Sequence, residues 1–195
     1  MQQVAIATNI NLLQKNKPYT FTTEEGKQKT LFDGRYACVC AMVLVQGEKT
    51  LWILANKRGP GCPNEVDKWN MPCGYMDAGS AEENCSKEVY EETGLKISPD
   101  EFSLIGISDT GKERNVTLRY IAVLHGEKPE LPSVESLKGL GGEENEVSEI
   151  KWIDINFLDK YKWAFNHDKV IEKTLMEAYQ YQKAQQIAKQ TIENK

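Results

Sequence analysis

The sequence contains no long run of apolar residues and no dense cluster of basic residues. No apolar stretch in its 195 residues approaches the roughly 18 that a membrane-spanning helix needs. The N-terminal residues lack the basic start and the long apolar core of a secretory signal. We therefore expect a cytoplasmic protein with no membrane partner.

Positive charge is also in short supply, because the formal net charge is −5. A protein that follows the phosphates of a long nucleic acid needs a basic face. Long nucleic acid is therefore not an expected partner. A small phosphorylated ligand remains compatible with this charge, since a few local cations and a metal can reverse the field inside one cleft.

Cysteine is infrequent and irregularly spaced, and no C-x-x-C pair occurs. An odd number of cysteines at irregular spacing argues against both a disulfide framework and a zinc site. Internal repeats and low-complexity linkers are absent as well. The length suits one domain that buries a sizeable core. The five cysteines are Cys38, Cys40, Cys62, Cys73 and Cys85.

The apolar pattern predicts several strands and two helices. Residues 36–59 form two β-rich runs around a turn at 46–49, and further strands are expected at 102–110, 117–126 and 148–155. The first helix should begin at Ser80, where S-A-E-E is a capping box, and end at Gly94. The second should begin near Asn166 or His167. This order predicts an α/β fold with a mixed β-sheet and helices on both faces.

The first helix carries an unusual group of acidic residues. Glu88, Glu91 and Glu92 fall within an arc of about 100° on a helix. Like charges at this spacing repel, and the helix C-terminus favours cations instead. A divalent cation such as Mg²⁺ would compensate, because it binds one or two carboxylates together with waters and phosphate oxygens. A solvated acidic surface is the alternative for such a run.

The surroundings of this helix favour the metal. Trp69, Pro72 and Gly74 form a W-x-x-P-x-G pattern in a tight loop ahead of the helix, and glycine at 74 permits close backbone approach. Residues 74–95 resemble the signature of the Nudix hydrolases, which ends in Arg-Glu-apolar-x-Glu-Glu-x-Gly-apolar. Here "KEVYEETGL" fills those last positions. The resemblance extends over most of residues 35–175 and implies a Nudix-like α/β/α sandwich.

The sequence departs from the family signature in its first half. The segment before Lys87 is one residue short, the first Glu is absent, and Lys87 replaces the arginine. In the family that Glu pairs with the arginine and braces the loop against the helix, whereas lysine cannot make the forked contact. We therefore expect the brace to be lost and the metal-binding face to be kept.

The resemblance implies a metal-dependent pyrophosphohydrolase that cleaves a nucleoside diphosphate linked to another group, with Mg²⁺ or Mn²⁺. By resemblance, Glu88 and Glu92 are direct metal ligands, Glu91 is a further ligand or acts through water, and the main chain at Cys73 or Gly74 completes the set. A later loop commonly supplies one more carboxylate, and Glu146 is the favoured candidate. The expected catalytic residues are Glu88, Glu91 and Glu146, and the expected metal ligands are Gly74, Glu88, Glu91 and Glu92.

Basic and aromatic residues near the signature are candidates for contacts with substrate. Arg58 and Arg35 suit phosphate because the guanidinium is a planar fork, and Trp69 and Tyr75 are candidates for stacking on a base. The alternatives are a surface position for each arginine and a core position for each aromatic. For Arg119, which alternates with apolar neighbours, the cleft and the solvent are equally consistent with the pattern.

Two further functions remain open at this point. The altered signature is compatible with a non-hydrolytic Nudix-type module that binds or senses a nucleotide. An enzyme acting on the 5′ end of RNA is disfavoured by the net charge of −5. We divide the chain into an N-terminal extension or hairpin packed on the domain (1–30), a Nudix-like catalytic domain (31–165) and a C-terminal helix (166–195), whose polar end is compatible with a homodimer.

Overall fold

The computed structural model describes residues 17–109 and 115–193 of the chain. The strands are β1 (Lys17–Thr22), β2 (Gln28–Asp33), β3 (Tyr36–Gln46), β4 (Leu51–Arg58), β5 (Trp69–Asn70), β6 (Cys73–Tyr75), β7 (Ser103–Ser108), β8 (Asn115–His125) and β9 (Val147–Asp154). The α-helices are α1 (Ala81–Thr93) and α2 (His167–Glu193), and the short 3₁₀ helices are η2 (Pro99–Glu101), η3 (Val134–Leu137), η4 (Ile155–Lys160) and η5 (Ala164–Asn166).

The main sheet is mixed, as the sequence predicted. The expected hairpin forms between β3 and β4, which pair antiparallel with Leu44 opposite Ile53. β7 and β8 are also antiparallel. The sequence predicts a turn between them at 111–115, and all of this turn but Asn115 lies outside the described residues. β8 runs parallel to β3 along its whole length. The main path of the sheet is β5-β4-β3-β8-β7, with β6 beside β3 and β9 beside β4.

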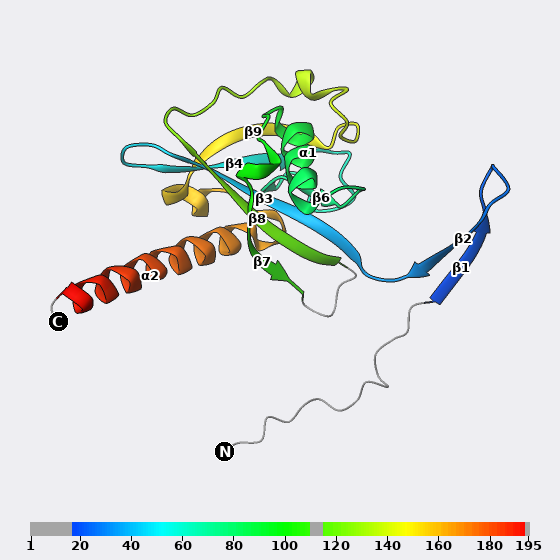
Figure 1. The fold of residues 1–195 in the computed structure, drawn as a ribbon. Helices are drawn as coiled ribbons and strands as arrows, with labels where there is room; N and C mark the ends of the chain where they lie inside the picture. The colour runs from blue at the N-terminus through cyan, green and yellow to red at the C-terminus, as the bar shows by residue number, and fades with distance from the viewer. Residues whose placement is uncertain (1–16, 110–114, 194–195) are drawn as a thin grey trace, which may run out of the picture.

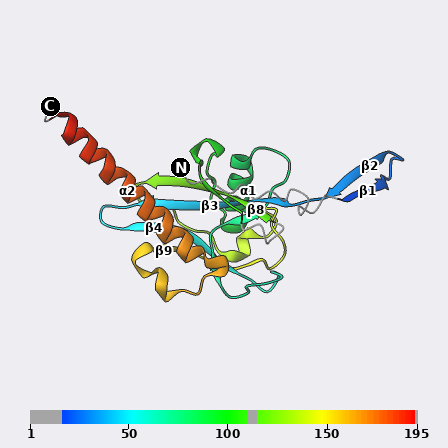
Figure 2. The same cartoon turned by 90° about the horizontal axis from the view of Figure 1, so that it is seen from below.

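Strand β3 lies at the centre and contributes to the core on both faces of the sheet. Val39 and Val43 pack with Val89 of α1 on one face. Met42 and Leu44 pack with Ile171 of α2 on the other. The alternation follows from the two-residue period of a strand. Figures 1 and 2 show the sheet between α1 and α2, which confirms the predicted α/β class with helices on both faces.

The hairpin β1–β2 forms a separate two-stranded sheet. Figure 1 shows it projecting from the body of the molecule beyond the start of β3. Residues 1–16 lie outside the described part of the chain, and the division of the chain into three parts stays a prediction. Within the described residues, no helix has the length and apolarity that crossing a membrane requires.

Helix α1 has the ends that its sequence predicted. The Glu83 N–H donates to Ser80 Oγ at 3.1 Å, and the Ser80 N–H donates to Glu83 Oε2 at 2.7 Å, so the capping box is complete. At the other end, Gly94 adopts φ 74°, the left-handed conformation that glycine favours. Both ends place the acidic residues of α1 at fixed positions opposite β6.

Substitution of the capping serine should lower the stability of the fold. We expect Ser80→Ala to reduce the free energy of unfolding by about 1 kcal/mol, because the Glu83 N–H loses its acceptor. Urea denaturation measures the difference. The control is Ser98→Ala, since Ser98 precedes η2 but its side chain makes no capping hydrogen bond. Equal losses in both variants would contradict the role of the cap.

Candidate metal-dependent hydrolase site

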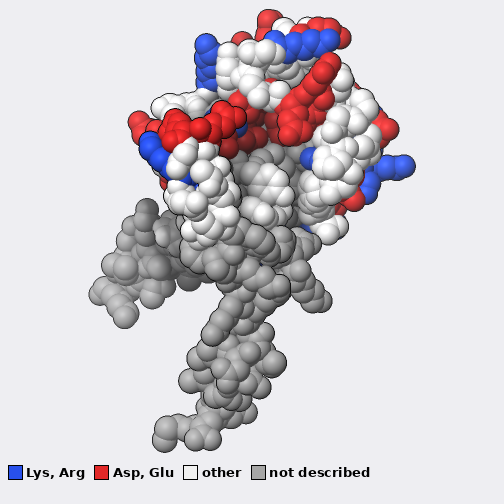
Figure 3. Space-filling model, turned by 90° about the vertical axis from the view of Figure 1, so that its right-hand side faces the viewer, with Lys and Arg blue, Asp and Glu red and all other residues white. Residues whose placement is uncertain are grey.

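The glutamates of α1 that the sequence singled out are held against the sheet. Only 8% of Glu88 and 2% of Glu92 is exposed, and the Glu91 side chain is 11% exposed. Burying an ionised carboxylate is costly unless it is paired or binds a metal. A solvated acidic surface, the alternative for this run of glutamates, is therefore wrong for these side chains. Figure 3 shows acidic side chains gathered around a hollow on the face that carries α1 and β6.

Gly74 makes the position of the Glu88 carboxylate possible. Gly74 lies in β6, opposite Val39 of β3. A Cβ built on Gly74 would overlap the Glu88 carboxylate. Any side chain at position 74 would therefore displace Glu88. The requirement for glycine here is steric, because the residue has no positive φ.

Glu92 is the most deeply buried carboxylate of the group. Its Oε2 accepts the Cys73 N–H at 3.3 Å, and no lysine or arginine of the described residues forms an ion pair with it. Burial raises its pKa well above the ordinary range, and the neighbouring Cys73, Glu146 and Glu88 add to that shift. A buried acid without a cation is a site where a bound metal ion would stabilise the charged form.

Glu146 joins the group from a loop that is distant in the sequence. Burial is the main cause that raises its pKa, Glu91 adds to the shift, and Arg58 opposes it. A Cβ built on Gly142 would lie 3.6 Å from Glu91 Cβ and 3.7 Å from Glu146 Oε2, which places these two side chains close together. A cavity of about 330 Å³, lined by Glu91 and Glu146 among others, lies between the C-terminal half of α1 and this loop.

The Gly59–Pro60–Gly61 segment fixes the main chain at Glu146. The Gly59 N–H donates to the Glu146 carbonyl at 2.6 Å, and the Gly61 N–H donates to the Asn145 carbonyl at 2.9 Å. Cys62 Sγ donates to the Glu146 carbonyl at 3.2 Å. Sequence reasoning assigned no role to Cys62, because a hydrogen bond to a main-chain atom leaves no pattern in the sequence.

Lys87 corrects the expectation that the brace of the signature is lost. Lys87 Nζ lies 3.0 Å from Asp77 Oδ2, so α1 is still tied to the loop that precedes it. The same amine lies 3.3 Å from Glu88 Oε1 and 3.1 Å from Glu91 Oε2. One ammonium thus replaces the arginine–glutamate pair, because Asp77 occupies the part of the loop that Lys87 can reach.

The chemistry of these donors fits a divalent cation. Carboxylate oxygens and main-chain carbonyls are the ligands that Mg²⁺ and Mn²⁺ prefer. Within the described residues, no three His, Cys, Asp or Glu side chains already surround one metal position. Such a cage is not required, because Mg²⁺ takes one or two carboxylates and fills its shell with waters and substrate phosphates. Two features fit such a cation: the buried Glu92, which forms no ion pair with a lysine or arginine of the described residues, and Gly74, which leaves room for the Glu88 carboxylate.

Of the four candidate substrate contacts, Arg58 is buried and Tyr75 is exposed. Arg58 is buried and donates from Nε to the Asn64 carbonyl at 3.1 Å, and its charge reaches Glu146. Tyr75 follows Gly74 directly and is 60% exposed. Arg58 thus lies near a carboxylate, whereas the ring of Tyr75 packs edge-on against Tyr36 at 5.9 Å between ring centroids.

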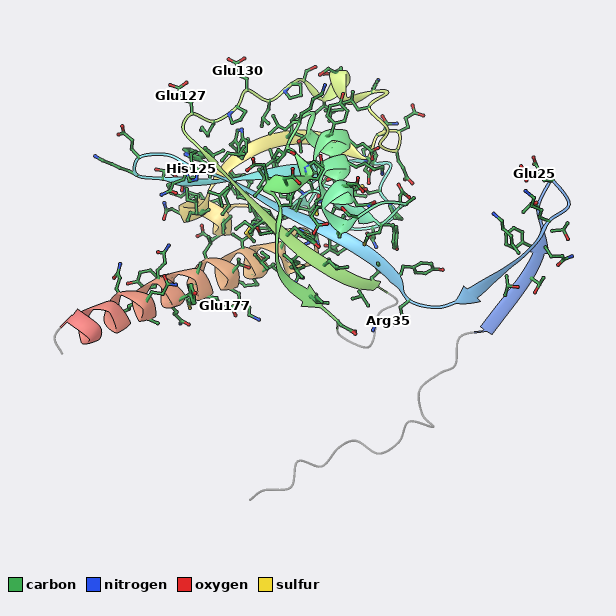
Figure 4. The ribbon with its side chains drawn as sticks, in the orientation of Figure 1. Glu25, Arg35, His125, Glu127, Glu130 and Glu177 are labelled. Carbon is green, nitrogen blue, oxygen red and sulfur yellow. The ribbon has the colours of Figure 1, made fainter. Side chains whose placement is uncertain are left out.

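Arg35 and Trp69 lie away from the carboxylates. Arg35 pairs with Asp109 at 2.6 Å and donates to the Asn115 carbonyl at 3.0 Å, and Figure 4 places it at the start of β3, away from α1. Trp69 is buried in the core on the α2 face, packed edge-on against Tyr161 at 5.6 Å between ring centroids. Trp69 therefore has the core position that was the alternative to stacking on a base.

His167 is held more tightly than its sequence context indicated. It is 5% exposed, and its Nδ1 accepts the Met71 N–H at 3.0 Å. Burial lowers its pKa, so the neutral imidazole is favoured. His167 therefore ties the start of α2, where the sequence places it, to the segment that leads into β6.

Comparison with known proteins places the chain in a family. The sequence model of the NUDIX domain matches residues 35–174, more than half of the chain, so the protein belongs to the Nudix family. The resemblance inferred from the signature is thereby confirmed. No curated protein sequence matches the chain.

Solved structures of Nudix proteins share the fold. A MutT/nudix family protein from Enterococcus faecalis superposes with a TM-score of 0.60 at 19% identity, over 80% of this chain and 66% of that one. The NUDIX domain of Shewanella oneidensis NrtR, in complex with ADP ribose, gives 0.57 at 18% identity over 75% and 89%. NrtR in complex with a 27mer DNA gives 0.52 at 18% identity over 74% and 62%. These matches confirm the Nudix-like mixed sheet.

Proposed function

We propose that the protein is a metal-dependent pyrophosphohydrolase that cleaves a nucleoside diphosphate linked to another group. The observation that carries this proposal is the burial of Glu88 and Glu92 against β6, where Glu88 packs on Gly74 and Glu92 accepts the Cys73 N–H. Membership of the Nudix family supports hydrolysis of a diphosphate bond in general. The nucleotide part of the substrate is suggested by the ADP ribose bound to the NrtR domain.

The carboxylates of α1 have distinct roles in this proposal. Glu88 and Glu92 would hold Mg²⁺ or Mn²⁺, with Gly74 contributing its main chain, and Glu91 would support the same ion directly or through water. The bound ion would neutralise charge on the phosphate oxygens as the anhydride bond breaks. Lys87 keeps the Glu88 and Glu91 carboxylates in place, since it lies within 3.3 Å of the first and 3.1 Å of the second.

Glu146 is the proposed general base. A water oxygen attacks one phosphorus, its proton passes to a Glu146 carboxylate oxygen, and the bond from that phosphorus to the bridging oxygen breaks. The leaving phosphate keeps the electron pair of that bond. Burial favours proton uptake by Glu146. Arg58, whose guanidinium is fixed by Asn64, is the proposed phosphate contact, and Tyr75, an exposed aromatic side chain, is the proposed stacking surface for a base.

A screen of diphosphate compounds with product analysis tests the proposal. In the presence of Mn²⁺ we expect release of a nucleoside monophosphate or of phosphate from at least one nucleotide-sugar, nucleoside triphosphate or dinucleotide. Addition of EDTA should stop the reaction, because the carboxylates alone do not neutralise the phosphates. Absence of any product over the whole panel, with Mg²⁺ or Mn²⁺ in excess, would overturn it.

A non-hydrolytic nucleotide-binding module is the second candidate. It is favoured by Lys87, which partly offsets the charges of Glu88 and Glu91 without a metal, and by the departures of the signature. The NrtR structures with ADP ribose and with DNA belong to a protein that binds ligands of both kinds. The expectation that long nucleic acid is not a partner of this chain therefore stays a prediction. Tight calorimetric binding of a nucleotide without any product would favour the module.

A further inference from the structure

A second cavity, of about 870 Å³, lies on the opposite face of the sheet from α1, between β8, β7 and the first turns of α2. Cavities of 300–1,000 Å³ are typical of small-molecule sites. Its lining residues include the cations Arg119, Lys169 and Lys173 and a single carboxylate, Glu177. Figure 4 labels Glu177 on α2. The cavity is thus basic in a protein whose net charge is −5.

Arg119 is the exceptional residue of this cavity. It lies in β8 beside Cys40 of β3 and Gly106 of β7, in the middle of the sheet. Its Nε is buried and has no hydrogen-bond partner within residues 17–109 and 115–193. Lys169 pairs with Glu172 at 2.9 Å, and Lys173 lies 3.7 Å from Glu177. A buried guanidinium donor without an acceptor is costly, and an anion in the cavity would supply that acceptor.

The cavity borders the carboxylate site. Asn64 and Phe165 line it, and both contact Arg58: the first accepts two hydrogen bonds from its guanidinium, and the ring of the second lies 5.0 Å below it. Arg58 in turn acts on Glu146. Cys38, which also lines the cavity, lies in β3 opposite Tyr75, the residue after Gly74. Arg58 therefore connects the lining of this cavity with Glu146 of the carboxylate group.

We infer that this cavity is a subsite for a phosphate group that the substrate carries in addition to the diphosphate that is cleaved, with Arg119 as its main contact. The part of this inference that concerns a substrate rests on the proposed hydrolysis. The anion site itself does not depend on it. Arginine suits this ligand because its planar fork matches two phosphate oxygens. Lys169 and Lys173 add positive charge at the side of α2.

Binding of inorganic phosphate to the metal-free protein tests the anion site directly. With EDTA present, the acidic group on α1 repels phosphate, so binding reports on the basic cavity. We expect phosphate, but not chloride at equal ionic strength, to shift the Arg119 Nε–H signal in nitrogen-15 NMR, with a dissociation constant in the millimolar range. Arg119→Gln should weaken binding about tenfold or more, because a charge-assisted hydrogen bond is lost.

Two further variants guard against a change in folding. Lys173 is exposed, so Lys173→Gln should keep the fold and weaken phosphate binding about twofold to fivefold. Lys183→Gln, on the same helix but outside the cavity, should bind phosphate like the wild type. The inference is wrong if phosphate leaves the Arg119 signal unchanged, or if both cavity variants bind phosphate as tightly as the wild type.

The substrate role is tested with matched pairs of diphosphate compounds, such as ADP-ribose and its 2′-phosphate. We expect Arg119→Gln to lower kcat/KM about 10- to 100-fold for the compound with the extra phosphate and less than about threefold for the other. Equal losses for both compounds would overturn the subsite. If neither pair member nor any other diphosphate is hydrolysed by the wild type, the proposed hydrolysis fails, and phosphate binding alone then decides the anion site.

Discussion

Glu92→Gln should greatly slow hydrolysis while making the metal-free protein more stable. Glutamine keeps the shape of the side chain and can still accept the Cys73 N–H, but it is a poor ligand for Mg²⁺. Loss of a charged ligand is expected to lower kcat/KM by about 10³-fold, which corresponds to about 4 kcal/mol of transition-state stabilisation. Steady-state kinetics with Mn²⁺ on the best substrate of the screen measures this loss.

The stability of the same variant gives an independent readout. Because burial raises the pKa of Glu92 in the folded state, the native protein holds its proton more tightly than the unfolded chain. Stability in EDTA should therefore fall as the pH rises above the unfolded pKa of about 4.3. Glu92→Gln lacks this contribution, so its melting temperature at neutral pH should exceed that of the wild type.

Added Mg²⁺ should reverse the order of stability. A ligand that binds only the native state raises the melting temperature of the wild type, whereas Glu92→Gln should respond little. Glu101→Gln is the matched control, since Glu101 is exposed and lies in η2, outside the carboxylate group. Wild-type turnover by Glu92→Gln, or a metal response equal to that of the wild type, would refute the assigned ligand.

Gly74→Ala, which adds a single methyl group, should also cause a large loss of activity, although a smaller one than Glu92→Gln. The added Cβ would overlap the Glu88 carboxylate, which must then swing away from β6. A displacement of about 1 Å at a reacting centre can reduce the rate by 10²-fold, and we expect a loss of this size or greater in kcat. The far end of a side chain gives way more easily than backbone, so the fold should persist, as circular dichroism would verify.

A double-mutant cycle separates this effect from a general loss of structure. If Gly74→Ala acts by displacing Glu88, the double variant with Glu88→Gln should be no less active than Glu88→Gln alone. Gly47→Ala is the control, because a Cβ there meets nothing closer than the Thr50 carbonyl at 3.4 Å. Additive losses in the cycle would show that Gly74 acts on something other than Glu88.

Local patterns in the sequence predicted the scaffold of the site. The ends of α1 were predicted because capping depends on Ser80, Glu83 and Gly94, which are close in the sequence. The strands β3, β4, β8 and β9 follow from apolar runs. The acidic stripe on α1 could be located because helical spacing alone brings its residues to one side.

Contacts between distant segments could not be predicted in this way. The bridge from Lys87 to Asp77 depends on the path of the loop before α1, which the altered signature does not specify. Arg35 ends beside Asp109 because β3 and β8 are parallel, a pairing that the apolar pattern leaves open. The burial of Arg119 Nε and of His167 likewise depends on how α2 packs across the sheet.

Main-chain hydrogen bonds between the Gly59–Gly61 segment and residues 145–146 hold Glu146 in place without the help of neighbouring side chains. Main-chain atoms make the Gly59 and Gly61 hydrogen bonds, and a Cβ on either glycine would collide with the carbonyl of residue 144 or 145. Substitutions at 60, 143 and 144 should therefore leave the course of the backbone at Glu146 unchanged, whereas Asn145, at φ 59°, has a conformation that few other residues adopt.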